Sequence, residues 1–129
     1  MKRKKIKLPK DNLKKECGIL WAKCVKARAG WKSELSGKTE NLNAHHLRGK
    51  SNYMLRFSLD NGFCLTNGEH FYIAHNTGRQ QGFEERVKAI RGADVFEKLE
   101  LLRSFSGKVD LFVVKAYLQQ KLNEFESKK

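Results

Sequence analysis

Three histidines and one asparagine near the middle of the chain have side-chain types and a spacing that suit metal-dependent chemistry. His45 and His46 are adjacent, Asn61 follows fifteen residues after His46, and His70 follows nine residues after Asn61. An imidazole can bind a divalent metal ion, and it can also accept a proton near neutral pH. The histidine pair can therefore supply one metal ligand and one general base.

Two strands and a helix are expected to hold these residues. The runs 43–47 and 59–66 are short and apolar, which is typical of strands. Residues 69–75 contain neither Gly nor Pro and are predicted to be helical. The expected order is strand, loop, strand, helix. The loop over 47–57 is long for a compact domain, which indicates a functional role.

This order of elements and residues resembles that of the HNH endonucleases, which have a ββα-metal fold. The resemblance covers about residues 31–76, and a looser similarity to phage-encoded members continues through the basic flanks. It implies that His45 and His70 bind the metal ion, that His46 is the general base, and that Asn61 shapes the loop. The histidine pair, the spacing and the helix-borne histidine together make the resemblance specific.

One feature of that family is missing from the sequence. Many members hold their strands with a zinc knuckle made of two Cys-x-x-Cys pairs. The four matching positions here are Ser33, Ser36, Thr66 and Glu69. Structural zinc requires Cys or His ligands, so no structural zinc is expected. We expect a hydrogen-bonded turn over 33–37 in its place, packed by Trp31 and Phe63.

The activity implied by the resemblance is hydrolysis of DNA phosphodiester bonds, by nicking or cutting with little sequence specificity. A divalent ion, Mg²⁺ or Mn²⁺, would neutralise charge on the phosphate and assist the leaving oxygen, and Ni²⁺ or Zn²⁺ could occupy the same site. The alternative is a non-catalytic DNA-binding module that retains the HNH fold. Loss of cleavage but not of DNA affinity in a His46→Ala variant would separate the two.

His75 is a further candidate ligand with a less favourable position. Five residues along a helix correspond to about 500 degrees, which leaves His70 and His75 about 140 degrees apart. We therefore expect His75 to cap the helix, contact DNA or face solvent unless the helix ends early.

The charge of the chain favours a polyanionic partner. There are 27 Lys and Arg residues against 14 Asp and Glu, a net charge of +13. Residues 83–129 carry ten basic and eight acidic side chains, so residues 1–82 hold +11 of that charge. The positive part of the chain is thus the part with the histidines, and DNA is the expected partner. A packaging or recombination complex of a phage could add specificity.

Basic residues around the histidines are the expected phosphate contacts. In the loop and the N-terminal arm these are Arg48, Lys50, Ser51, Arg56, Lys2, Arg3, Lys4 and Lys5. Residues 1–10 are predicted to form a flexible basic arm that ends at Pro9. Tyr53 and Phe57 could pack the loop or stack on a base, and packing is the commoner role of such rings.

The flanking segments are predicted to be helical scaffold, giving an α+β fold with one domain over 11–129. A helix is expected over 11–29, capped by Asp11, and three more over 80–127. The apolar spacing of the last three is typical of core faces, with a dimer interface as the alternative. The sequence leaves the oligomeric state open.

The cysteines and the hydropathy indicate a protein inside a bacterial host cell, in the cytoplasm. Cys17, Cys24 and Cys64 fit neither a disulfide framework nor a common zinc pattern, so buried thiols are expected. No stretch has the length of a transmembrane helix, and the basic start lacks the apolar core of a signal peptide.

Overall fold

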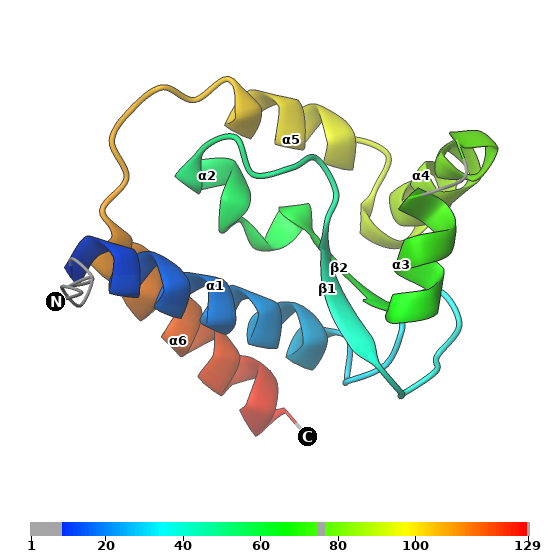
Figure 1. The fold of residues 1–129 in the computed structure, drawn as a ribbon, viewed down its shortest axis with the longest axis horizontal. Coiled ribbons are helices and arrows are strands. Elements are labelled where there is room, and N and C mark those ends of the chain that lie inside the picture. The colour runs from blue at the N-terminus through cyan, green and yellow to red at the C-terminus, as the bar shows by residue number, and fades with distance from the viewer. Residues whose placement is uncertain (1–8, 75–76, 129) are drawn as a thin grey trace, which may run out of the picture.

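The fold combines helices with one small sheet (Figure 1). The computed structural model describes residues 9–74 and 77–128. In chain order its elements are α1 (Pro9–Arg28), β1 (Leu42–His46), α2 (Tyr53–Arg56), the 3-10 turn η1 (Leu59–Asn61), β2 (Gly62–Thr66), α3 (Asn67–Ala74), α4 (Thr77–Arg91), α5 (Val95–Arg103) and α6 (Leu111–Ser127). The α+β class predicted from the sequence is confirmed.

Helices α1 and α6 pack side by side although they lie at opposite ends of the chain (Figure 1). The apolar stripe of α1 is buried against α6, and two of its thiols donate hydrogen bonds to that helix. Cys17 Sγ reaches Leu111 O at 3.4 Å, and Cys24 Sγ reaches Leu118 O at 3.2 Å. Cys64 is also buried, so the prediction of three free, buried thiols is confirmed.

The start of α1 differs from the prediction. Helix α1 includes Pro9 and Lys10, so these two residues do not belong to an arm, and Asp11 lies inside the helix and is not its cap.

The sheet consists of β1 and β2 in antiparallel register, with His46 opposite Gly62 and Leu42 opposite Thr66. The segment between the strands is not an open loop as predicted. Asn52 caps the short helix α2 by accepting a hydrogen bond from Leu55 N, and η1 then replaces the first three residues of the predicted second strand. The strand therefore begins at Gly62, not at Leu59.

The sheet separates two hydrophobic clusters, because successive side chains of a strand point to opposite faces. Cys64 of β2 belongs to the cluster of α1 and α6. Its neighbours Phe63 and Leu65 belong to the cluster formed with α3, α4 and α5. The same alternation in β1 places Ala44 on the α1 side and directs His45 toward Phe83 of α4, whose ring lies 5.9 Å away.

The three C-terminal helices predicted from apolar spacing are present. Helix α4 covers Thr77–Arg91, so it includes three residues before the start at 80 that we expected. Helix α6 buries Leu111, Leu118 and Leu122. No helix within 9–74 or 77–128 combines the length and hydropathy that a membrane crossing requires.

Candidate metal and phosphate site

His45 and His70 come together from the end of β1 and from α3. The distance between His45 Nδ1 and His70 Nε2 is 3.0 Å, and the ring centroids are 4.4 Å apart. Both side chains are partly buried. The antiparallel pairing of the strands holds β1 beside β2, and α3 follows β2 directly, so two residues far apart in sequence meet at one point.

A distance of 3.0 Å between the two nitrogens fits a hydrogen bond, and it also fits two ligands of one metal ion. Two imidazole nitrogens bound about 2.1 Å from an ion, at a right angle to one another, lie about 3.0 Å apart. In the part of the chain that the structure describes, no group of three or more His, Cys, Asp or Glu side chains comes together as a metal site. The pair therefore forms a two-ligand set, which leaves most positions around an ion for water and substrate.

His46 points to the other side of β1 and is fixed by two contacts. Its ring stacks on Trp21 of α1 with a centroid distance of 3.9 Å and an angle of 9°. Its Nε2 lies 3.0 Å from the carbonyl oxygen of Arg56. A carbonyl can only accept a hydrogen bond, so Nε2 carries the proton and Nδ1 keeps its lone pair. Nδ1 is thus the nitrogen of His46 that can accept a proton.

The protein environment keeps both adjacent histidines neutral at pH 7. Burial lowers the pKa of His45 to about 4, helped by the charges of His70 and His46. Burial also lowers the pKa of His46 to about 4; the hydrogen bond to the Arg56 carbonyl opposes this shift, and the nearby charges of Lys50 and Arg56 add to it. Neutral imidazole is the form that binds metal ions and accepts protons.

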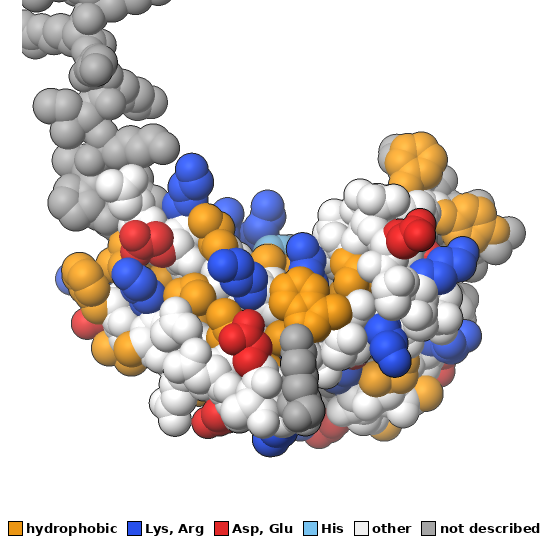
Figure 2. Space-filling model, turned by 90° about the horizontal axis from the view of Figure 1, so that it is seen from below, with side chains coloured by type: hydrophobic (Ala, Val, Ile, Leu, Met, Phe, Trp, Pro, Cys, Tyr) orange, Lys and Arg blue, Asp and Glu red, His pale blue; other side chains and the backbone are white. Residues whose placement is uncertain are grey.

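One pocket, of about 240 Å³, is lined by both His45 and His46 although their rings leave the strand on opposite sides. Leu47, Arg48, Ile73, Gln80, Phe83, Glu84 and Phe96 complete the lining. Figure 2 shows a histidine side chain at the floor of a hollow, with Lys and Arg side chains beside it.

Asn61 is fully buried and holds the segment that follows the histidine pair. Its Oδ1 accepts a hydrogen bond from Arg48 N at 2.8 Å. Its amide nitrogen donates to Gly49 O at 2.9 Å and to Leu55 O at 3.0 Å. Such bonds from an asparagine side chain to the backbone brace the segment that follows β1.

The predicted phosphate contacts do not all lie together. Arg48 lines the histidine pocket, and the charges of Lys50 and Arg56 act on His46. Ser51 instead lines a separate, mainly apolar pocket beside α6. Of the two rings in the segment, Phe57 is buried in the core as predicted, and Tyr53 packs beside it at 5.8 Å. Lys2, Arg3, Lys4, Lys5 and His75 lie outside the described residues.

A hydrogen-bonded network links the positions that the sequence resemblance matches to a zinc knuckle, namely Ser33, Ser36, Thr66 and Glu69. Glu69 Oε1 accepts from Ser33 Oγ at 2.6 Å and from Thr66 N at 2.8 Å, and Thr66 Oγ1 accepts from Glu69 N. The last two bonds form a capping box at the start of α3. Ser33 Oγ also accepts from Ser36 N. Burial raises the pKa of Glu69, but these hydrogen bonds outweigh it and leave the pKa lowered.

The expected turn over 33–37 is therefore present, but its packing differs from the prediction. Phe63 is buried, whereas Trp31 lies at the surface with 37% of its area exposed. Trp31 has a positive φ of 58° at the end of the turn that follows α1, and its backbone N–H donates a hydrogen bond to Lys26 O.

Two residues of the site were not predicted. Trp21, which stacks on His46, could have been found because it extends the apolar stripe of α1 at the four-residue step from Cys17. Only glycine fits beside it at position 62, since a Cβ there would overlap Val25 and lie 3.0 Å from the Trp21 ring. No feature of the sequence marks Glu84 as a site residue, because an acidic residue on a helix is most often simply exposed to solvent.

Comparisons of the chain with family models, with curated proteins and with solved structures found no match.

Proposed function

We propose that this protein is a metal-dependent endonuclease of the HNH type that hydrolyses DNA phosphodiester bonds. The observation that carries the proposal is the 3.0 Å approach of His45 Nδ1 and His70 Nε2 beside a pocket that His46 also lines. Phosphodiester hydrolysis needs a base for the attacking water and positive charge at the phosphate. The order of β1, β2 and α3 around these residues further supports a ββα-metal assignment.

His45 and His70 are the residues that would hold the metal ion. When bound, the ion supplies Lewis acidity at a phosphate oxygen and a partner for the leaving oxygen. Two imidazole ligands favour Mn²⁺, Ni²⁺ or Zn²⁺ over Mg²⁺ in affinity, because imidazole suits transition metals and Mg²⁺ prefers oxygen ligands. Availability in the cell still allows Mg²⁺ or Mn²⁺ to be the working ion.

His46 would act as the general base. Its Nδ1 accepts a proton from the attacking water, while Nε2 remains hydrogen-bonded to the Arg56 carbonyl. That carbonyl stabilises the imidazolium that forms, and Trp21 keeps the ring from turning away. The chain thus orients the base before substrate arrives, which reduces the entropic cost of the reaction.

DNA is the proposed substrate because the chain combines this pocket with a net charge of +13. Lys50 and Arg56 place positive charge next to His46. Contacts between such side chains and phosphates position a protein without reading base sequence, so low intrinsic specificity is expected. A partner protein would have to supply any strict target choice.

Incubation of the purified protein with supercoiled plasmid tests the proposal. We expect nicked and then linear DNA with Mn²⁺ or Ni²⁺, slower conversion with Mg²⁺, and none with excess EDTA. Raising the salt from 50 to 200 mM should weaken DNA binding steeply because phosphate contacts release counterions. Salt-sensitive binding without cleavage by any of these ions would instead identify a non-catalytic DNA-binding module.

A further inference from the structure

Arg48 is held in place at both its backbone and its guanidinium group. Asn61 fixes the backbone N–H of Arg48, as described above. The guanidinium carbon lies 4.0 Å from the centre of the Phe96 ring, and Nη1 forms an ion pair of 2.7 Å with Glu84 Oε1. A long, flexible side chain is thereby restricted to one position.

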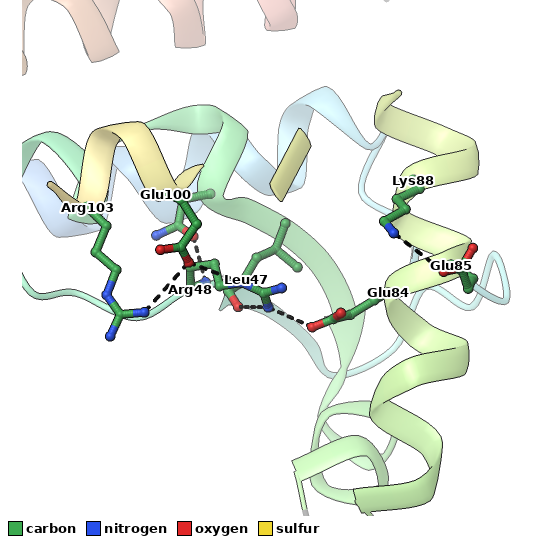
Figure 3. Close-up of polar contacts among 8 residues, drawn as sticks. Leu47, Arg48, Glu84, Glu85, Lys88, Glu100 and Arg103 are labelled. Atoms are coloured by element: carbon green, nitrogen blue, oxygen red, sulfur yellow. Dashed lines mark hydrogen bonds and ion pairs between the residues drawn. The ribbon is translucent and has the colours of Figure 1, made fainter. Parts of the chain in front are cut away.

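The two residues that hold the guanidinium come from the C-terminal helices and not from the strands. Glu84 lies on α4 and Phe96 on α5, and Figure 3 shows Glu84 directed from its helix toward Arg48. Glu84, Arg48, His45 and His46 all line the same pocket. The helical extension therefore contributes to the site itself as well as to the scaffold.

The ion pair with Glu84 leaves part of the guanidinium available to a ligand. Nη1 is occupied by Glu84 and, at 3.4 Å, by Leu47 O. Nη2 makes no hydrogen bond to any of the described residues, and 26% of the side chain is exposed. A guanidinium can bind phosphate through its free edge, and one that is already oriented loses less entropy on binding.

We propose that Glu84 is a positioning residue that aims Arg48 at the phosphate being cleaved, an inference that rests on the proposed nuclease function. Arg48 then contacts the phosphate, and Glu84 acts only through Arg48. Glu84 then has two opposite effects. Its negative charge weakens DNA binding, whereas its ion pair with Arg48 speeds the reaction.

Glu100 provides a matched control for this proposal. Its carboxylate lies near the same guanidinium, but at 3.9 Å from Nε, and its side chain is 55% exposed. It also pairs with Arg103 at 3.6 Å (Figure 3). Replacing either glutamate by alanine removes one negative charge near Arg48, but only the Glu84 change releases the short bond to Nη1.

The test compares Glu84→Ala, Glu100→Ala, Arg48→Ala and the double variant Arg48→Ala/Glu84→Ala. Cleavage is measured under single-turnover conditions with Mn²⁺, and DNA affinity is measured in EDTA. We expect Glu84→Ala to cleave about tenfold more slowly, since small errors in position are costly, while binding DNA at least as tightly as the wild type. Glu100→Ala should keep the wild-type cleavage rate. Arg48→Ala should reduce the slope of log affinity against log salt by about 0.9, as expected for one lost phosphate contact.

The double variant shows whether Glu84 works through Arg48. We expect Arg48→Ala/Glu84→Ala to cleave at the rate of Arg48→Ala alone. A further tenfold loss in the double variant would overturn the proposal, and so would a wild-type rate in Glu84→Ala. Thermal unfolding of each variant fixes an assay temperature at which all are folded. If the wild type does not cleave at all, the proposed function fails first and the positioning role fails with it.

Discussion

Replacing His46 by alanine is expected to lower the rate of metal-dependent cleavage by about 10²- to 10⁴-fold, the usual contribution of a general base. The variant loses the only nitrogen of that side chain that is free to accept a proton, since Nε2 is bonded to the Arg56 carbonyl. DNA affinity and metal affinity should stay close to those of the wild type, because His46 binds neither DNA nor the metal ion in the proposed mechanism. Plasmid nicking and gel-shift titrations measure these quantities.

Addition of free imidazole separates loss of the base from loss of structure. The His46→Ala variant leaves a space beside Trp21 that an imidazole molecule can enter. We expect imidazole to restore part of the cleavage in this variant and none in His70→Ala, where a metal ligand is missing. A His46→Ala protein that nicks plasmid at the wild-type rate without imidazole would show that His46 is not the base.

Replacing Asn61 by alanine should reduce the free energy of unfolding by about 3–5 kcal/mol, because one buried and two partly buried hydrogen bonds of this side chain are lost together. The side chain is fully buried, and its partners Arg48 N, Gly49 O and Leu55 O are left without it. The total stability of a domain is usually about 5–15 kcal/mol, so a large share is at stake. Urea unfolding followed by circular dichroism gives the difference directly.

Asn43→Ala is the matched control for the Asn61 variant. Asn43 lies on β1 and makes one exposed side-chain hydrogen bond, of 3.3 Å, to Asn67. Deleting the same amide there should cost less than about 0.5 kcal/mol, as is usual at the surface. Equal destabilisation by the two substitutions would mean that the Asn61 bonds do not hold the segment after the histidine pair.

The sequence was sufficient to predict what depends on local pattern. Apolar spacing located α4, α5 and α6, and the runs around the histidines located β1 and α3. The cap at Asn52 was missed, although an asparagine three residues before Leu55 is a recognisable start signal for a short helix. The 3-10 turn η1 was missed as well, and it shortens the second strand from the start that we predicted.

Contacts between distant segments could not be predicted in the same way. Trp21 lies 25 residues before His46, and Glu84 lies 36 residues after Arg48. Which side chains meet over such separations depends on how α1 and α4 pack on the sheet, and no periodicity in the sequence encodes that. The network of Ser33 and Glu69 shows the same limit. The sequence shows that the cysteines of a zinc knuckle are absent, but it does not show which hydrogen bonds replace them.

Calorimetric titration of Ni²⁺ into the wild type, His45→Ala, His70→Ala and His46→Ala tests directly whether His45 and His70 form one metal site. We expect one ion per wild-type chain, at least a tenfold loss of affinity in both His45→Ala and His70→Ala, and near wild-type affinity in His46→Ala. Unchanged Ni²⁺ affinity in both His45→Ala and His70→Ala would show that these two residues do not form a metal site.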